Sequence, residues 1–535
     1  MSNTATFDDS SAIPATKETP AAPPQAWTPS FNPWLIAASV MSATFMEVLD
    51  TSVANVALPH IAGNLSASTD EATWVLTSYL IANAIILPAT GWLTTVFGRK
   101  KFLITCIIIF TAASALCGAA TNINLLIIAR ILQGAGGGAL QPIAQSVLLE
   151  SFPPEKRGSA MALYGLGVVV APIIGPTLGG WITDNYSWRW IFYINLPIGI
   201  LASFMAGRYV EDPPYLRNQK PGRIDYIGFG LMALGLAALE LTLDLGQQRD
   251  WFSSPTIVFT TAVAVAALVT FVVWELYTPE PIVNLRVFMN RNFAVGTVMI
   301  ASVGVVLYGS TALLPLFLQT LLGYPAVQSG LAVSPRGLGS MVSMLVVGRL
   351  IGRIDGRYLI AFGFLVLAFS TDYFTGITLD IAQTNIIYPM IISGFAMGFV
   401  FVPLTTMTMG TLSNEQIGNA SGIYNLMRNT GGSIGIAAMT TFLARGAQTH
   451  QAALAPNLTP YNPAFQEMVA RVQQSLGGAS VEQAYGVVYN MLVRQAAILS
   501  YIDNFRLLVI LCLLCVPAAF LFKKVTSAKP PPGAH

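Results

Sequence analysis

The chain has 535 residues, of which 54% are hydrophobic and only 10% are charged, and its formal net charge is +2. Soluble globular proteins carry roughly 25% charged residues, so this composition excludes an ordinary soluble domain and predicts a protein embedded in lipid. A net charge so close to zero argues against a nucleic-acid partner. The stretch before Asn32 is rich in Pro, Ala and Thr and lacks the pattern of a cleaved signal, so we expect a disordered tail.

Hydrophobic runs long enough to cross a bilayer, about 20 residues each, recur along most of the chain. They predict an all-α integral membrane protein with fourteen spans. An even number of spans places both termini on the same side of the membrane. The predicted spans are residues 34–58, 72–92, 102–121, 125–148, 160–182, 189–208, 224–246, 256–276, 292–318, 328–350, 358–377, 386–410, 418–444 and 505–522.

Lysine and arginine gather in alternate loops between these spans, for example at residues 99–101 and 217–223. Because basic loops stay in the cytoplasm, both termini are predicted to be cytoplasmic. The one sizeable loop predicted on the opposite side is 445–504, which is either a docking surface or a passive connector with short helices on the bilayer. The residues expected to give this loop an apolar contact face, at helical spacing, are Phe465, Met468, Val469 and Val472.

Two segments combine glycines with cations at places where helices meet or turn. The loop after the second span reads GWLTTVFGRKK and contains Gly91, Gly98 and Arg99, so the glycines permit a tight turn while the cations face the inner leaflet. The fourth span reads RILQGAGGG and contains Arg130 and Gln133. It places a guanidinium inside the bilayer beside a glycine-rich face that lets another helix approach closely.

The first and fifth spans carry two further patterns. The first reads LDTSVANVALP over residues 49–59, and it includes Asp50 and Asn55. The fifth includes the segment APIIGPTLGG over residues 171–180, whose two prolines and three glycines predict a bent helix with a flat face suited to sliding or rocking. These five residues are Pro172, Gly175, Pro176, Gly179 and Gly180.

Together these segments resemble the major facilitator superfamily. The Arg130 segment is similar to its motif B, residues 175–180 to motif C of drug:proton antiporters, and residues 49–59 to the LDxTxxNVALP signature of the fourteen-helix, EmrB- and QacA-like members. Short segments near residues 153–157, 195–199 and 251–254 look most like the EmrB type. One position departs from the family, because Thr95 stands where the loop motif usually has an acidic residue. In the family that carboxylate holds cytoplasmic helix ends together, so the resemblance does not identify the group that does so here.

The resemblance covers about residues 34–523 and implies a major facilitator fold with 6+2+6 helices. Two six-helix bundles would rock about a site near the midplane, with the extra helix pair inserted between them. The implied parts are a tail at 1–33, a bundle at 34–208, a linker at 209–291 with the pair 224–246 and 256–276, a bundle at 292–522 that includes the periplasmic loop 445–504, and a tail at 523–535.

Charged side chains inside predicted spans are costly unless paired or facing water, so each is a candidate functional residue. Glu47 and Asp50 share one face of the first span and differ in depth by roughly 4.5 Å. Their mutual repulsion makes at least one hold a proton more tightly, so the pair is predicted to exchange a proton for a drug. Arg130 lies at the depth of Asp50 and is either a structural partner or a group that couples protonation to conformation. In the alternative, Asp50 alone is the acid and Glu47 merely lines a polar path.

Other residues are expected along a substrate path or, alternatively, in ordinary helix packing. Arg428 is the buried cation of the second bundle, and Glu240 lies in the inserted pair. Arg336 is interpreted as a structural or access-path residue. Polar, aromatic and methionine side chains predicted to adapt to flat amphipathic ligands are Asn55, Trp74, Tyr79, Gln133, Phe401 and Met407.

The chain contains no GxxxxGK[ST] loop, no HExxH and no spaced Cys/His set. We therefore expect no ATP site, metal, cofactor or enzymatic activity, and a proton gradient as the energy source. The predicted function is multidrug efflux of small amphipathic compounds across the inner membrane. The resemblance also implies an EmrA-like periplasmic adaptor and a TolC-like outer-membrane channel. An exporter or facilitator of one metabolite, or a non-transporting sensor, stays open.

Overall fold

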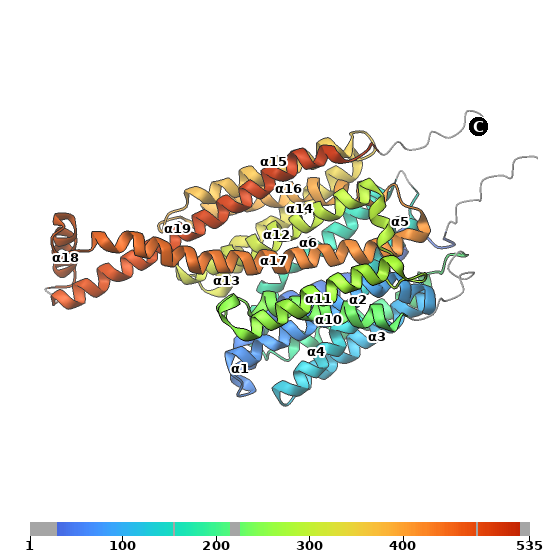
Figure 1. Ribbon diagram of the computed structural model, residues 1–535, viewed down its shortest axis with the longest axis horizontal. Helices are drawn as coiled ribbons and strands as arrows, with labels where there is room; N and C mark the ends of the chain where they lie inside the picture. Colours follow the sequence, from blue (N-terminus) through green and yellow to red (C-terminus); the bar gives the residue numbers. More distant parts are fainter. Residues whose placement is uncertain (1–28, 154–155, 215–224, 478–479, 525–535) are drawn as a thin grey trace, which may run out of the picture.

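Long helices packed side by side make up most of this computed structural model (Figure 1). Every regular element among the described residues is helical, which confirms the predicted all-α class. The expected tails fall largely outside the described part of the chain. The residues that the structure describes are 29–153, 156–214, 225–477 and 480–524.

The first half of the chain forms a bundle in which α1 packs against α5, α6 and α8, and α4 packs against α2 and α3. Two predicted spans of this half, the fourth and the sixth, are each divided into two helices. The fourth is interrupted at its glycine run, just before Pro142, because glycine weakens a helix and proline lacks the N–H that a helix interior needs. The helices are α1 (Pro33–Asn64), α2 (Thr69–Phe97), α3 (Arg99–Gly118), α4 (Ile123–Gly137), α5 (Leu140–Ser151), α6 (Arg157–Asn185), α7 (Trp190–Tyr193) and α8 (Asn195–Tyr209).

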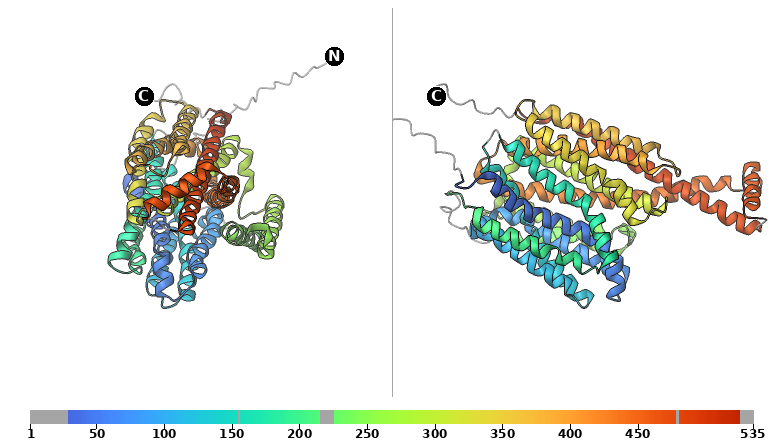
Figure 2. Two further views of the ribbon diagram at one scale, coloured as in Figure 1. Left: turned by 90° about the vertical axis from the view of Figure 1, so that its left-hand side faces the viewer. Right: turned by 180° about the vertical axis from the view of Figure 1, so that it is seen from behind.

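The second half forms a similar bundle, in which α12 packs against α17 and α14 packs against α16. Between the two halves comes a hairpin of α10 (Tyr226–Leu245) and α11 (Pro255–Tyr277), which Figure 2 shows outside the two bundles. Helix α10 contacts α2 of the first bundle and α17 of the second. The remaining helices are α12 (Arg291–Thr320), α13 (Ala326–Val333), α14 (Pro335–Leu350), α15 (Gly356–Asp372), α16 (Gln383–Met409), α17 (Asn414–Leu454), α18 (Pro463–Ser475) and α19 (Val481–Ala518).

Thirteen helical stretches of the described chain are long and apolar enough to cross a membrane, and they match thirteen of the predicted spans. The fourteenth, predicted at 418–444, lies within α17, which is 41 residues long. Helix α17 is less apolar than the others because Asn425, Arg428 and Asn429 interrupt its hydrophobic surface. It packs within the second bundle against α12 and α19, so it occupies the place of a span.

Residues 445–504 were predicted to form a loop with short helices, and α18 is a helix of that kind, but the prediction is wrong for most of the segment. Helix α17 continues to Leu454 and α19 begins at Val481, so the two helices project beyond the bundles as a stalk, with α18 across its tip (Figure 1). A hydropathy window misses this because a helix that leaves the bilayer becomes polar without ending. The capping box of Ser480 and Gln483 marks the true start of α19.

The apolar face predicted for this region is used inside the stalk. Phe465, Val469 and Val472 of α18 are buried against Ala484 and Val488 of α19. A residue of the predicted face that stays outside this cluster is Met468, whose exposed fraction is 45%. The prediction that this whole face is free for a partner is therefore wrong.

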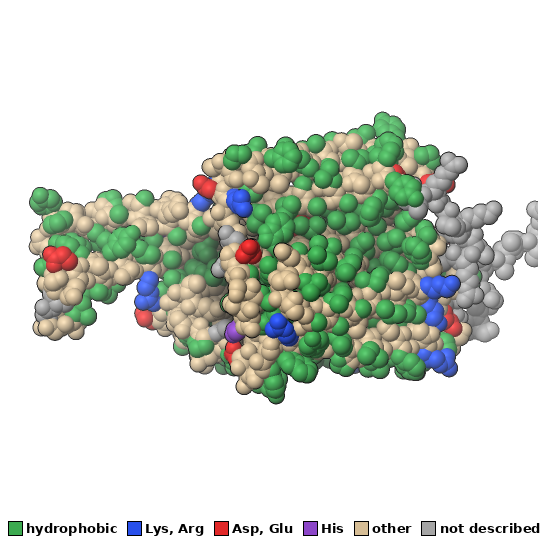
Figure 3. All heavy atoms as spheres, turned by 90° about the horizontal axis from the view of Figure 1, so that it is seen from below, with side chains coloured by type: hydrophobic (Ala, Val, Ile, Leu, Met, Phe, Trp, Pro, Cys, Tyr) green, Lys and Arg blue, Asp and Glu red, His purple; other side chains and the backbone are tan. Residues whose placement is uncertain are grey.

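The two ends of the bundle differ. Near residue 30 and near residue 523 the chain lies at the same end, since Ser30 N–H donates to Glu211 at 3.0 Å and Lys523 N–H donates to Asn292 at 2.8 Å, beside the start of α12. We call this the termini end, and the opposite end, where α17 and α19 project, the stalk end. Figure 3 shows that the surface between them is largely hydrophobic, with Lys and Arg toward both ends.

Glycines let the helices of the first bundle approach closely. A methyl group on Gly134 of α4 would collide with the backbone carbonyl of Tyr79 on α2. Gly98 has φ +79° between α2 and α3, a conformation that favours glycine in this tight turn. The glycine pattern of the fourth span therefore determines which helix it contacts.

We expect Gly134→Ala to lower the apparent melting temperature of the purified protein, because the helices must separate. Overpacking of this kind costs about 1–3 kcal/mol. Gly230→Ala on α10 is the matched control, since nothing lies within 4 Å of its added methyl group. Helix propensity favours that control change by about 1 kcal/mol. An equal fall in melting temperature for both variants would contradict the close-packing argument.

Candidate functional site

A buried ion pair joins α1 to α4 inside the first bundle. Arg130 Nη1 lies 2.6 Å from Asp50 Oδ2, and the two side chains are 0% and 1% exposed. The other carboxylate oxygen, Oδ1, accepts hydrogen bonds from Gln133 Nε2 at 2.9 Å and from Asn195 Nδ2 at 2.6 Å. Both oxygens of the carboxylate are therefore occupied, as a charge excluded from water requires.

The guanidinium of Arg130 is held from several sides. Its Nε donates to the Val75 carbonyl of α2 at 3.0 Å, and Nη1 also donates to Gln133 Oε1 at 2.8 Å. The plane of the group lies 4.2 Å from the centre of the Tyr79 ring, a cation–π arrangement. Among the predicted residues, Asp50, Arg130, Gln133 and Tyr79 thus form one cluster.

Glu47 occupies a second, adjoining cluster. Its side chain is buried and accepts hydrogen bonds at Oε1 from Tyr79 Oη at 3.1 Å and Asn83 Nδ2 at 3.2 Å. Oε2 accepts a hydrogen bond from Gln141 Nε2 at 2.7 Å. All three donors are neutral, in contrast to the guanidinium that serves Asp50. The two acids of the first span therefore differ in the way their charge is stabilised.

The Glu47 cluster reaches the second bundle through Gln141. Its Oε1 accepts a hydrogen bond from Arg428 Nη2 of α17. One helical turn away, Gln145 Oε1 accepts from Asn425 Nδ2 at 2.7 Å, and Tyr164 Oη donates to Asn425 Oδ1 at 3.1 Å. This polar seam between α5, α6 and α17 connects the acids of one bundle to a cation of the other.

On the termini side of this seam the two bundles are in direct contact. Gly91 of α2 faces Asn419 of α17 so closely that an added methyl group would lie 2.7 Å from the Asn419 Cα. Gly422 of α17 faces Leu87 of α2 in the same manner, and Gly158 of α6 faces Ile351 beyond α14. The path between the bundles is thus closed at the termini end.

The motif of the fifth span packs on the first span. Ser52 Oγ donates to the Pro172 carbonyl at 3.0 Å, and a methyl group on Gly175 or Gly179 would collide with Ser52 or Val53. Gly180 faces Val327 of the second bundle at ordinary contact distance, and the fifth residue of this motif, Pro176, lies inside α6. The flat face predicted from these residues is present, and α1 occupies it.

The loop motif is held within the first bundle. Arg99 forms a two-point ion pair with Glu150 at the end of α5, with N···O distances of 2.8 and 3.0 Å. Thr95, which replaces the family's acid, donates to the Trp92 carbonyl of its own helix at 2.7 Å. The ends of α2 and α17 therefore meet through the close contact of Gly91 with Asn419, without an acidic side chain at position 95.

Several predicted path residues lie away from the cluster. Asn55 and Trp74 are exposed in the stalk-side parts of α1 and α2. Met407 lies two residues before the end of α16, where a methyl group on Gly356 would meet its sulfur at 2.5 Å. The structure therefore places Met407 in packing at the termini end, and its role along a substrate path stays a prediction.

Phe401 and Glu240 lie at contacts between helices of different parts. Phe401 stacks on Tyr164 with ring centres 6.1 Å apart, across the boundary between α16 and α6. Glu240 is buried and lies within hydrogen-bonding reach of Ser433 on α17. Asp244, one turn further along α10, accepts a hydrogen bond from Thr77 of α2. The inserted hairpin thus contacts both bundles through polar groups.

Uncharged polar residues are what the sequence prediction missed. Gln141, Gln145, Asn83, Asn195 and Asn425 all lie buried in apolar helices. Gln141 and Gln145 are spaced by one helical turn, and Asn425 precedes Arg428 by three residues, so their placement on one helix face was a detectable signal.

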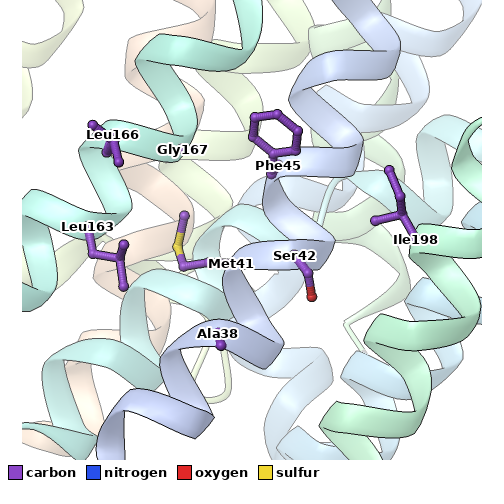
Figure 4. A pocket seen from close by; sticks show the side chains of 8 residues that line it. All are labelled: Ala38, Met41, Ser42, Phe45, Leu163, Leu166, Gly167 and Ile198. Carbon is purple, nitrogen blue, oxygen red and sulfur yellow. The ribbon is translucent and has the colours of Figure 1, made fainter. Parts of the chain in front are cut away.

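An apolar groove lies apart from these polar clusters. It has a volume of about 440 Å³, and Figure 4 shows side chains from α1, α6 and α8 around it. Ser42 supplies a hydroxyl in this lining, and that hydroxyl donates to the Ser39 carbonyl of its own helix. The candidate site is therefore the polar seam rather than this groove. The lining residues are Ala38, Met41, Ser42, Phe45, Leu163, Leu166, Gly167 and Ile198.

Comparison with known families agrees with this architecture. The model of the Major Facilitator Superfamily matches residues 40–436. The chain belongs to the major facilitator superfamily. It is therefore a multi-pass membrane transporter, and the predicted membership is confirmed.

Relatives in this superfamily match almost the whole chain. The multidrug export protein EmrB of Escherichia coli is 39% identical over 92% of this chain and 94% of its own length. The fatty acid resistance protein FarB of Neisseria gonorrhoeae is 39% identical over 91% of this chain and 94% of its own. The human organic anion transporter MFSD10 shares the fold, with a TM-score of 0.56 and 12% identity over 90% of this chain and all of that one.

For the central ion pair, we expect Arg130→Ala to be more damaging than Arg130→Lys. Removing one partner of a buried pair leaves an uncompensated charge and costs about 3–5 kcal/mol. Lysine keeps the charge but loses the planar group that bonds Val75 and lies over Tyr79. Apparent melting temperature and efflux should both rank parent, lysine, alanine. Parent-like values for both variants would exclude a structural and a coupling role for Arg130.

Proposed function

We propose that this transporter exports small amphipathic compounds in exchange for protons. The observation that carries the proposal is the buried carboxylate of Glu47, which is held by neutral donors and linked through Gln141 to Arg428 of the other bundle. A carboxylate in such a place is stabilised in its charged form by hydrogen bonds alone. Glu47 is thus the group whose negative charge a bound proton would remove or a cationic ligand would compensate.

In this proposal Glu47 and Asp50 have different tasks. Asp50 stays paired with Arg130 and fixes α1 against α2 and α4 through charged contacts. Glu47 lies at the boundary with the second bundle and carries the transported proton. Rocking of the bundles would expose it first to one side of the membrane and then to the other, as alternating access requires.

The orientation follows from the charges. Lys and Arg are concentrated in chain segments of the termini end, such as residues 99–101 at the start of α3, and basic loops face the cytoplasm, so we assign the termini end to the cytoplasm of an inner membrane. The contacts of Gly91 and Gly422 then close the cytoplasmic side. We further propose that the proton gradient is the energy source, that no cofactor takes part and that the chain is not an enzyme.

Amphipathic compounds of more than one charge type fit the seam. Glu47 offers a negative group and Arg428 a positive group, and the stacked rings of Tyr164 and Phe401 lie beside them. The names of the relatives, which refer to multidrug export and to fatty acid resistance, agree with this range. A resistance profile of cells with and without the chain would separate a multidrug pump from an exporter of one metabolite.

Purified Glu47→Gln protein should lose substrate-induced proton release and pH-gradient-driven uptake into inverted vesicles. The change removes the titrating group and keeps the shape, while its NH2 group donates a hydrogen bond as the O–H of a protonated Glu47 would. Asp50→Asn should also abolish transport, because Arg130 is left unpaired, but it should lower the melting temperature as well. Glu467→Gln, on the exposed surface of α18, is the control and should leave both assays unchanged. Full proton release from Glu47→Gln protein would overturn the assignment of the carrier.

The stalk suggests a periplasmic partner. Helices α17 and α19 extend past the bundle, and this stalk carries exposed aromatic side chains: Tyr485 and Tyr489 lie on α19, and Tyr461 lies in the connector before α18. Rigid aromatic groups are frequent anchors of protein interfaces. We propose that this surface contacts an EmrA-like adaptor that leads to a TolC-like outer-membrane channel.

Replacing residues 455–479 by a flexible linker should abolish resistance in whole cells and spare transport in inverted vesicles. The replacement removes α18 but keeps α17 and α19 complete, so the seam at Gln141 and Arg428 is untouched. Vesicle transport needs no partner beyond the membrane. Unchanged whole-cell resistance at equal expression would leave the stalk tip without a docking role.

A further inference from the structure

The side-chain amide of Gln141 contacts both Glu47 of the first bundle and Arg428 of the second, so a change at Glu47 can alter the contact with Arg428. Its nitrogen donates to Glu47 Oε2 at 2.7 Å, so its oxygen is the end that faces Arg428 and accepts from Nη2. The two hydrogen bonds use opposite ends of the same planar group. Which end faces Glu47 therefore determines which end is offered to Arg428.

The hydrogen-bonding need of Glu47 changes when it takes up a proton. An ionised carboxylate only accepts hydrogen bonds, whereas a protonated one carries an O–H that must donate. Tyr79 and Asn83 already occupy Oε1 as donors, so the new O–H on Oε2 faces Gln141. To accept it, the amide must turn its oxygen toward Glu47. Its NH2 group then faces the guanidinium, and two donors cannot bond each other.

We propose that Gln141 is a positioning residue whose amide couples the protonation of Glu47 to the hydrogen bond that joins α5 to α17. With Glu47 ionised, Gln141 holds Arg428 and the two bundles stay together on the termini side. With Glu47 protonated, that bond is lost and the termini side opens. This inference rests on the proposed role of Glu47 as proton carrier and adds the element that converts its charge into movement.

The remaining charged and titratable groups around Glu47 do not replace it in this role. Asp50, on the same helix, is committed to Arg130 of α4. Tyr79 donates a hydrogen bond to Glu47 and Tyr164 donates one to Asn425. The groups concerned are Tyr79 of α2, Asp50 of α1, Arg130 of α4, Tyr164 of α6, Tyr308 of α12 and Arg428 of α17.

The direction of the effect agrees with exchange. A proton taken up from the stalk side would open the termini side, where the proton can leave and a substrate can enter. Loss of the proton restores the Gln141–Arg428 hydrogen bond and closes that side again. Proton entry and substrate exit are thereby tied to the same bond without direct contact between proton and substrate.

The opening can be followed with a cysteine in place of Thr94. This residue is buried on α2, facing Gly418 of α17 across the termini-side contact, so a soluble maleimide reaches it only when the bundles separate. The four native cysteines are buried, and the parent without the Thr94→Cys change provides the blank. Less thiol is ionised at lower pH, so labelling is expressed throughout as the rate for Thr94→Cys divided by the rate for Tyr461→Cys, a position that is 93% exposed. This ratio should rise about tenfold from pH 8 to pH 6, within the usual range of coupling between sites.

Two substitutions of Gln141 should act in opposite directions. Gln141→Met cannot bond Arg428, so labelling should be fast at every pH. Gln141→Glu offers Arg428 an acceptor whatever the state of Glu47, so labelling should be slow at every pH. In both variants the change between pH 8 and pH 6 should fall below about twofold, outside the usual coupling range. A merely structural role would move both variants in the same direction.

Gln145→Met is the matched control. Gln145 also bonds the other bundle, through Asn425, but its hydrogen bond does not involve an acid. Its loss should speed labelling at all pH values and keep the full pH dependence. Retained pH dependence in Gln141→Met and Gln141→Glu would overturn the proposal. If Glu47→Gln also kept pH dependence and proton release, the proposed carrier itself would be wrong, which is a separate outcome.

Discussion

A charge inside an apolar bundle must be neutralised or fully hydrogen-bonded, and this constraint organises the first half of the molecule. The ion pair of Asp50 and Arg130 draws α1 and α4 together, and Arg130 extends the contact to α2 through Val75. Because these three helices are fixed by one charged centre, Glu47 on the same helix is held in register with α2 and α5. The neutral cluster around Glu47 therefore depends on the charged pair beside it.

The two bundles carry complementary charges in their interiors. In the first, Arg130 neutralises Asp50 and the remaining acid Glu47 is held by neutral donors, whereas the second contains Arg336 and Arg428. Arg336 donates to the hydroxyls of Ser310 and Thr311 at 3.2 Å, so neutral oxygens accept the hydrogen bonds of this cation. Attraction between opposite interiors favours association of the bundles, and Gln141 stands directly between the acid and the cation nearest to their boundary.

Much of this arrangement follows from the sequence because hydrophobic length and intramembrane charge are strong signals. The pairing of Asp50 with Arg130 could be predicted from their equal depth in two spans. Gln141 and Asn425 were missed because an uncharged amide hardly alters the hydropathy of a span. Their partners lie in another bundle, more than 260 residues away in sequence, and only the fold brings them together.

Hydropathy also misled where a helix leaves the membrane. The segments on either side of α18 read as polar connectors, yet capping and composition continue the helices of the bundle. Met407 was placed near the ligand path from its residue type alone, and its actual position near Gly356 reflects its distance from the helix end. Element type was therefore easier to predict than element length or the neighbours of single side chains.

Helix α17 carries Asn425 and Arg428 at the seam and runs without interruption to Leu454 in the stalk. A stiff helix transmits tilt along its length, so a change at the seam displaces the distant tip as a lever does. A partner that binds the tip more tightly at one tilt of α17 than at another must, because coupling is reciprocal, shift the equilibrium of the seam toward the arrangement with that tilt by the same free energy. The proposed attachment point would therefore also be a mechanical input to the transport cycle.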